Sequence, residues 1–246
     1  MKFGLIGYPL THSYSKQYFN DKFTFLQLAG FSYDNFPLAD IDDVMPLLHQ
    51  DFLGFNVTIP YKEEILHYIN DIDDEAFEIG AVNTLVRSGA NSWKGFNTDA
   101  SAFQHTIIDW FAEENLPEKA LILGTGGASK AVAFILRQLG IQPSFVSHHF
   151  HGQYSYAELN RQIIEEHTLI VNCTPVGMFP HADQAPEIPY FAITPEHHLY
   201  DLIYNPVNTV FLTRGEQAGA RTKNGLEMLR LQAEHAWAIW KSYGKF

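Results

Sequence analysis

The sequence predicts an α/β protein made of two lobes, because short apolar runs alternate with segments of helical periodicity along its 246 residues. The pattern starts again after the loop ENLPEK at 114–119, which ends a long helical segment. Hydrophobic residues make up 46% of the chain, enough to fill a core in each lobe. We therefore expect a mainly parallel sheet in the N-terminal lobe and a second, separate strand–helix series after it.

The N-terminal lobe is expected to begin with an apolar strand at 2–7 and a helix at 13–28, where aromatic residues recur on one side. Two acidic helical pieces follow Lys62. The other expected elements are a strand, a helical stretch, another strand and a hairpin of two strands, at 30–38, 41–50, 53–59, 81–88 and 92–97.

The second series opens with a long helix from Thr98, in which Phe103, Ile107 and Phe111 recur at helical spacing. Strands and helices then alternate: strands at 120–124, 143–147, 167–172 and 198–203, and helices at 131–140 and 156–166.

A last helix is expected at 226–240, with Leu226, Leu229, Ala233 and Trp240 on one face. Terminal helices of this kind often pack back on the first lobe. We therefore expect 1–100, completed by 219–246, to form the first lobe and 101–218 the second.

Composition narrows the class of partner. The formal charge is −12 and the chain has no basic stretch, which argues against nucleic acid or an anionic membrane and favours a small molecule. Cys173 is the only cysteine, which excludes an internal disulfide and fits a reducing cytoplasm. No apolar run is long enough for a signal peptide or a membrane-spanning helix. We expect a cytoplasmic protein.

A glycine-rich turn between a strand and a helix predicts a dinucleotide site. Gly124, Gly126 and Gly127 would let the backbone approach a pyrophosphate at the helix N-terminus. Ser129 holds the position of the third glycine in the usual spacing, so a plain strand-to-helix turn stays open as an alternative.

The end of the next strand bears on the choice of cofactor. NAD sites commonly place Asp or Glu there and NADP sites place Arg nearby, but this chain has neither. Ser147, His148 and His149 could donate hydrogen bonds to a 2′-phosphate, which favours NADP and leaves NAD possible. The same stretch, HHFH at 148–151, lacks the spacing of a metal site, and we expect no metal.

Hydroxyl and amide side chains gather where several strands of the first lobe end. Ser13 and Ser15 stand at a helix start, where they could cap the helix or bind a carboxylate or polyol. Asn56, Asn83 and Asn97 follow or end strands, as turn residues also do. In open α/β sheets, ligands bind outside the carboxyl ends of the strands, where such loops meet.

Two charged residues have both a structural and a functional interpretation. Asp99 suits the first turn of a helix. Lys62 ends the stretch NVTIPYK, either as a solvated charge or as the reason for the turn at Pro60.

Eight motifs occur in an order that resembles the shikimate dehydrogenase family over nearly the whole chain. They are GYPLTHSYS followed by Asn20, NVTIPYK, GAVNT, NTD, GTGGAS, NCTPVGM, DLIYNP and NGLEMLRLQA. The resemblance implies a substrate-binding lobe and a Rossmann-like NADP-binding lobe. It also implies the reversible, metal-free reduction of 3-dehydroshikimate to shikimate with NADPH, on the chorismate route to aromatic amino acids.

Carried over by position, the resemblance makes Lys62 and Asp99 the catalytic pair, in which a lysine ammonium supplies a proton and a carboxylate holds it. Ser13 and Ser15 would bind the substrate carboxylate. The rest of the substrate pocket would consist of Asn56, Thr58, Asn83, Tyr204 and Gln232, and the cofactor site would consist of Gly124, Gly126, Gly127, Ala128, Thr174, Leu202, Gly225 and Met228.

The chain departs from the family pattern in two places. Lys16 and Phe19 replace the usual Pro and His after the serine pair. Ser147 and the two histidines after it replace an Arg-containing stretch, so we expect modest NADPH affinity that improves as pH falls through the titration of histidine near ~6.5.

Three alternatives remain open at this point. They are an NAD-dependent quinate/shikimate dehydrogenase, a catalytically silent metabolite-binding protein, and an enzyme resembling methylenetetrahydrofolate dehydrogenase. Retention of both Lys62 and Asp99 argues against the second, and the paired serines argue against the third. We expect a monomer or homodimer.

Overall fold

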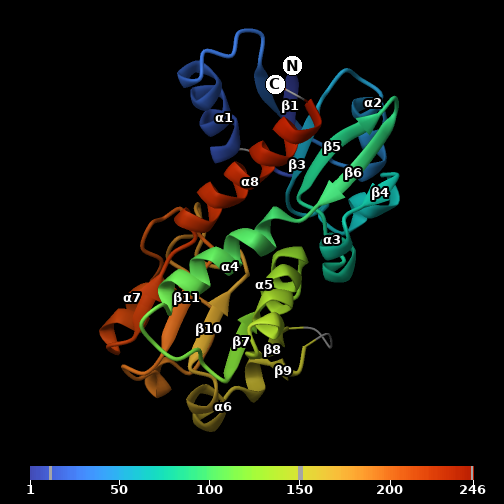
Figure 1. Cartoon of the computed structure of the whole chain (residues 1–246). Helices are drawn as coiled ribbons and strands as arrows, with labels where there is room; N and C mark the ends of the chain where they lie inside the picture. The colour runs from blue at the N-terminus through green and yellow to red at the C-terminus, as the bar shows by residue number, and fades with distance from the viewer. Residues whose placement is uncertain (11–12, 149–151, 245) are drawn as a thin grey trace. The chain divides into compact units, whose positions relative to one another are not determined.

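The computed structural model describes residues 1–10, 13–148, 152–244 and 246 and contains two compact units (Figure 1). The first unit is Met1–Thr98 with Gln232–Phe246, and the second is Asp99–Leu231. The sequence places the second lobe's end at 218, but the compact unit continues to Leu231. It does so because Arg221–Lys223 (β12) pairs with the second unit's sheet.

The first unit is built on a six-stranded mixed sheet, in the order β2-β1-β3-β5-β6-β4. Strands β2, β1 and β3 are parallel, whereas β5 is antiparallel to β3 and β6. The strands are Lys2–Gly7 (β1), Ser32–Pro37 (β2), Gly54–Val57 (β3), Asp71–Ile72 (β4), Thr84–Gly89 (β5) and Ser92–Phe96 (β6). The sequence analysis missed only β4, which is too short to show a pattern.

Both faces of this sheet are covered. Phe3 and Leu5 of β1 belong to one buried cluster and Ile6 to the other, because successive side chains of a strand point to opposite faces. The helical elements are α1 (Tyr14–Phe25), two 3-10 turns (Ile41–Asp43, Glu64–His67), α2 (Val44–Leu48), α3 (Asp74–Ile79) and the end of α8 (Leu226–Gly244).

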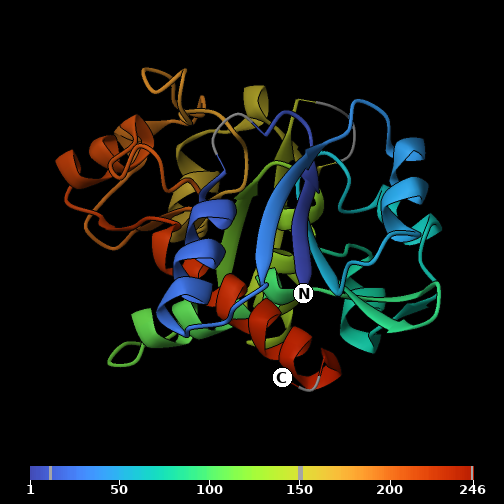
Figure 2. The same ribbon diagram turned by 90° about the horizontal axis from the view of Figure 1, so that it is seen from above.

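Helix α8 packs beside α1 within the first unit (Figures 1 and 2). Its buried face there consists of Ala233, Ala236, Trp237 and Trp240. These side chains form one cluster with phenylalanines of α1 and β1. The expected face also included Leu226 and Leu229, but both residues are only half-buried and belong to the second unit.

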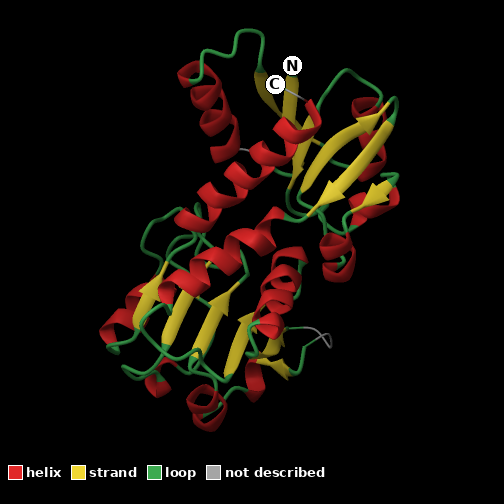
Figure 3. Ribbon diagram, in the orientation of Figure 1, coloured by secondary structure: helices red, strands yellow, loops and turns green. Residues whose placement is uncertain are grey.

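The second unit contains an all-parallel sheet in the order β12-β11-β10-β7-β8-β9 (Figure 3). Numbered within this sheet and read from β9, the order is 3-2-1-4-5-6, that of a doubly wound dinucleotide-binding fold. The other strands are Lys119–Leu123 (β7), Gln142–Ser147 (β8), Tyr154–Ser155 (β9), Leu169–Asn172 (β10) and His198–Asp201 (β11).

The helical elements of this unit are α4 (Thr98–Trp110), which starts at the last residue of the first unit, α5 (Gly127–Gln138), α6 (Arg161–Glu166), α7 (Val210–Gln217) and 3-10 turns at Tyr156–Glu158 and Tyr190–Ala192. The sequence analysis missed β9, β12 and α7. Within the described part of the chain, no helix has the length and apolar character needed to cross a membrane.

Candidate functional site

In the first unit, the predicted polar residues lie at one edge of the sheet. Leu5 of β1 is opposite Asn56 of β3, Asn56 is opposite Thr84 of β5, and Thr84 is opposite Phe96 of β6. The carboxyl ends of β1, β3 and β6 and the amino end of β5 therefore meet at the same edge. This register brings the serine, asparagine and threonine segments together.

A buried hydrogen-bond network joins these segments. The Tyr33 hydroxyl donates to Asn56 Oδ1 over 2.8 Å. Asn56 Nδ2 donates to Thr84 Oγ1 over 3.2 Å. Asn83 continues the network, because its Nδ2 donates to Thr98 Oγ1 over 3.0 Å.

Asn83 also anchors the start of α4. Its Oδ1 accepts the backbone N–H of Thr98 over 2.7 Å, one of the helix N-terminal donors that lack a partner within the helix. Asn97 donates through Nδ2 to the Ala81 carbonyl over 2.9 Å. Both asparagines are buried, so they hold these loops together whatever else they bind.

The two serines differ in their surroundings. Ser13 caps α1, since its Oγ accepts from the Lys16 N–H over 3.3 Å. A hydroxyl that accepts at a cap still has a proton to donate. Ser15 lies in the first turn of α1 and is 9% exposed.

The segment that carries Lys62 is held on both sides. The Thr58 N–H donates to the Ile6 carbonyl over 2.9 Å, and the Lys62 carbonyl accepts from the Val82 N–H over 2.7 Å. Lys62 is half-buried. Asp99 is buried in the first turn of α4 and is the first residue of the second unit, so its pairing with Lys62 stays a prediction.

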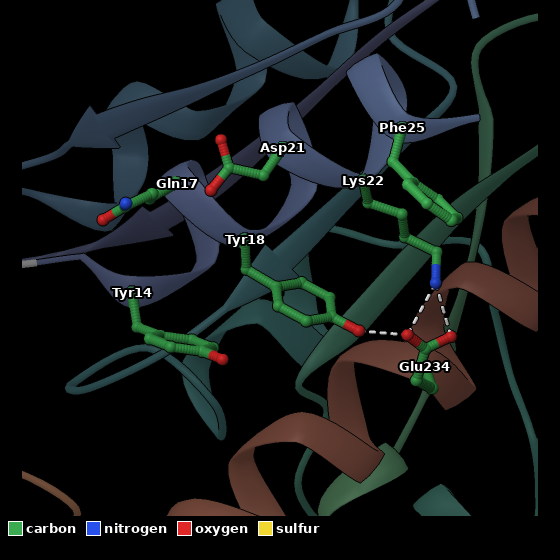
Figure 4. Close-up of a pocket in the computed structure, with 7 residues that line it drawn as sticks. All are labelled: Tyr14, Gln17, Tyr18, Asp21, Lys22, Phe25 and Glu234. Atoms are coloured by element: carbon green, nitrogen blue, oxygen red, sulfur yellow. Dashed lines mark hydrogen bonds and ion pairs between the residues drawn. The ribbon is translucent and has the colours of Figure 1, made fainter. Parts of the chain in front are cut away.

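A surface hollow of about 530 Å³ lies elsewhere on the first unit, between α1 and α8 (Figure 4). Lys22 donates to both carboxylate oxygens of Glu234 over 2.6 Å, and Tyr18 donates to the same carboxylate. These charges satisfy each other and none of the lining residues belongs to the predicted site. We therefore assign the candidate substrate site to the polar sheet edge.

In the second unit, the glycine turn has the geometry that a pyrophosphate requires. Gly124 has φ +104°, in the left-handed region, and a side chain there would meet Thr174 Cγ2 at 3.0 Å. A Cβ at Gly126, the N-cap of α5, would meet nothing within 4 Å. Ala128 lies in the first turn of α5.

The turn also contains an unsatisfied polar atom. Ser129 is fully buried, and its Oγ has no hydrogen-bond partner among the described residues. The strands β7 and β10 on either side of this point are those at which the strand order reverses, where doubly wound sheets bind ligands. The open turn and this orphaned hydroxyl fit a bound dinucleotide.

A second buried network joins the loops after β10 and β11. Thr174 donates to Asn172 Oδ1 through its backbone N–H over 3.0 Å and through its hydroxyl over 2.6 Å. Asn172 Nδ2 donates to Asp201 Oδ1 over 3.0 Å. Asp201 also accepts from Thr209 over 2.6 Å and from the Ile203 N–H over 3.0 Å. Burial raises the pKa of Asp201 to about 6, against the opposing effect of these donors.

The residues predicted for the cofactor include a second position that only glycine fits. A Cβ at Gly225 would lie 2.0 Å from the Leu202 carbonyl oxygen. Met228 is buried, and Tyr204 is half-buried on the loop after β11. Gln232 is buried on the part of α8 that belongs to the first unit.

The predicted phosphate end of the cofactor site is only partly described. Ser147 is buried at the end of β8, and the exposed His148 stacks on Tyr156 with ring centroids 4.4 Å apart. His149 and the next two residues lie outside the described residues, and so does most of the HHFH stretch. Among the described residues, no group of three or more His, Cys, Asp or Glu side chains could hold a metal ion.

The sequence analysis missed six side chains of these networks: Tyr33, Thr84, Thr98, Asn172, Asp201 and Thr209. A signal exists for Asn172, a polar residue at the end of an otherwise apolar strand. Tyr33 carries no such signal, since a tyrosine in a strand is ordinary.

Comparisons with known proteins point to one family. Residues 5–85 match the model of the shikimate dehydrogenase substrate binding domain. The chain is 37% identical to a "Shikimate dehydrogenase (NADP(+))" of Halothermothrix orenii, covering 96% of this chain and 89% of that protein.

Two solved structures are similar in fold. One is shikimate 5-dehydrogenase of Thermus thermophilus in complex with NADP(H) and shikimate, with a TM-score of 0.82, 31% identity and coverage of 98% of this chain and 94% of that one. The other is shikimate 5-dehydrogenase of Listeria monocytogenes in complex with shikimate and NAD, with a TM-score of 0.80, 26% identity and coverage of 98% and 91%.

Proposed function

This chain belongs to the shikimate dehydrogenase family, and we propose that it catalyses the reversible NADPH-dependent reduction of 3-dehydroshikimate to shikimate. The observation that carries the proposal is the similarity over 96% of the chain, which spans both the polar sheet edge and the glycine turn. The reaction belongs to the biosynthesis of chorismate and the aromatic amino acids.

The polar sheet edge supplies the substrate contacts. Ser13 and Ser15 donate to the carboxylate, a role that suits short hydroxyls at a helix start. The hydroxyls of the ring meet the other polar side chains proposed for the pocket: Asn56, Thr58, Asn83, Tyr204 and Gln232. Asn56 and Asn83 already bond within the protein, which supports a fixed orientation for each amide.

Lys62 and Asp99 carry the proton chemistry. As the ketone is reduced its oxygen gains negative charge, and the Lys62 ammonium donates the proton that this oxygen needs. Asp99 holds the ammonium and keeps it charged. In the reverse direction Lys62 takes the proton from the hydroxyl.

Bound NADPH supplies the hydride. The first-turn amides of α5 and the glycines at 124, 126 and 127 hold its pyrophosphate. Leu202, Gly225 and Met228 line the nicotinamide end, and Thr174 is a further cofactor contact. The buried Asn172 and Asp201 support this arrangement, because they fix the loops that carry Thr174 and Leu202.

NAD is the second candidate cofactor. The described strand end holds Ser147 and His148, without the Arg that would favour a 2′-phosphate or the carboxylate that would repel it. We propose NADPH as the preferred cofactor, with NADH used more weakly.

We also propose that the enzyme is cytoplasmic, acts as a monomer or homodimer and has no nucleic-acid partner. The net charge of −12 and the single cysteine support these points.

The experiment that tests the proposed function is a spectrophotometric assay with shikimate or quinate and with NADP or NAD. We expect turnover of shikimate with NADP to exceed the other three combinations. Lys62→Ala should lower kcat by at least ~10²-fold while the KM for shikimate changes far less, as expected for the loss of a general acid.

Lys241→Ala is the matched control, because Lys241 is an exposed lysine near the end of α8. It should leave kcat unchanged. If Lys62→Ala lowers kcat and the affinity for shikimate equally, Lys62 binds the substrate and does not act as a general acid. An unaltered protein without turnover would refute the proposed function.

A further inference from the structure

Tyr33 lies in β2, the outermost strand of the sheet, and its hydroxyl reaches Asn56 at the polar sheet edge. Its side chain is 0% exposed, and its ring stacks on Phe19 with centroids 4.7 Å apart and planes 15° apart. The Asn20 side chain bonds both backbone groups of Tyr33, donating to the carbonyl over 2.9 Å and accepting from the N–H over 3.1 Å. The position of the Tyr33 hydroxyl is therefore fixed by helix α1.

One departure from the family pattern contributes to this packing. Phe19, which replaces the usual His, provides the flat ring on which Tyr33 stacks. Lys16, which replaces the usual Pro, pairs with Asp34 next to Tyr33 over 2.9 Å. Both replacements thus join α1 to β2 around Tyr33.

The Tyr33 hydroxyl holds a residue proposed for the substrate. It donates its one proton to Asn56 Oδ1 over 2.8 Å. Asn56 is 4% exposed, and its Nδ2 donates to Thr84 Oγ1 over 3.2 Å. The donor at one end of the amide and the acceptor at the other decide how the amide lies.

We propose that Tyr33 is a positioning residue that holds the Asn56 amide in the orientation in which it meets the substrate. The proposal rests on the proposed function.

A phenylalanine at this position keeps a ring that can stack on Phe19 but has no proton to donate. It therefore leaves the buried Asn56 Oδ1 without this partner.

The test compares Tyr33→Phe with the unaltered enzyme in steady-state assays. We expect the KM for shikimate to rise about tenfold, the effect of one net hydrogen bond, while kcat and the KM for NADP stay within about twofold. Tyr200→Phe is the matched control. Tyr200 is equally buried and makes one 2.8 Å side-chain hydrogen bond, to Thr106 of α4. It should leave the KM for shikimate unchanged.

A double-mutant cycle with Asn56→Ala gives a second measurement. If Tyr33 acts through Asn56, the two substitutions together should raise the KM for shikimate little more than Asn56→Ala alone. Independent, multiplying effects would overturn the proposal.

The other outcomes are separable. An unchanged KM for shikimate in Tyr33→Phe, with an active parent enzyme, would overturn the positioning role alone. A lower kcat and a higher KM for both ligands, with a lowered melting temperature, would mean a purely structural role. This result too would overturn the positioning role. An inactive parent enzyme would instead refute the proposed function.

Discussion

Single residues at the two polar edges act through their partners. The hydrogen bonds of Asp201 cannot be predicted from its position in the sequence. In the folded chain it accepts three hydrogen bonds, one of them from the Asn172 side chain. Asn172 in turn fixes Thr174. A carboxylate without a direct role in the chemistry thus decides the orientation of a residue proposed to touch the cofactor.

Asp201 should make stability depend on pH. Burial raises its pKa from 3.8 to about 6, so between these values the folded protein holds a proton that the unfolded chain has lost. Its favourable contribution is complete below about pH 4 and is lost as pH rises through about 6. The loss is on the order of 2 to 3 kcal/mol, at 1.36 kcal/mol per pKa unit.

Asp201→Asn removes this titration and keeps the shape of the side chain. Urea denaturation at several pH values gives the unfolding free energy of the parent and of the variant. We expect the difference, parent minus variant, to decrease from pH 4 to pH 7. A difference that is the same at all these pH values would contradict the raised pKa.

At the scale of elements, close approach decides how α8 packs in the first unit. Trp240 lies over β3 at Gly54, where an added Cβ would be 2.1 Å from Trp240 Nε1. The same Nε1 donates to the Leu85 carbonyl of β5 over 2.9 Å. Glycine at this position is therefore what lets the indole reach its backbone partner.

We expect Gly54→Ala to destabilise the protein by about 1 to 3 kcal/mol, the usual cost of overpacking a core, because a buried ring has no room to move. Gly89→Ala is the control, since its Cβ would meet only Ser92 Cβ at an ordinary 3.6 Å. Thermal or urea unfolding measures both. Equal stability of the two variants would show that Trp240 can shift.

At the scale of the whole molecule, each compact unit has its own core and its own polar edge. All the residues proposed for the cofactor belong to the second unit, whereas those proposed for the substrate come from both. The two ligands should therefore protect different segments of the chain from hydrogen exchange.

The rate of amide hydrogen exchange in each segment measures this protection. We expect NADPH alone to slow amide exchange in the turn at 124–129 and in the loops after β10 and β11, and to leave β3 and β5 unchanged, because its proposed contacts are all in the second unit. Protection of β3 or β5 by NADPH alone would contradict this division of contacts.

The sequence by itself determined the class of fold, most of the elements and the order of the motifs. Apolar periodicity, the helix cap at Ser13 and the glycine turn are local features, and local features can be read from neighbouring residues. The short strands β4, β9 and β12 were missed, since two or three residues show no period.

Only the tertiary structure decided which polar residues meet. Tyr33 and Asn56 are 23 residues apart and Asn172 and Asp201 are 29 apart, and each pair is joined by strand register and packing rather than by any local pattern. Register and packing depend on the complete sheet and its helices, so these networks could be seen only once the chain was folded.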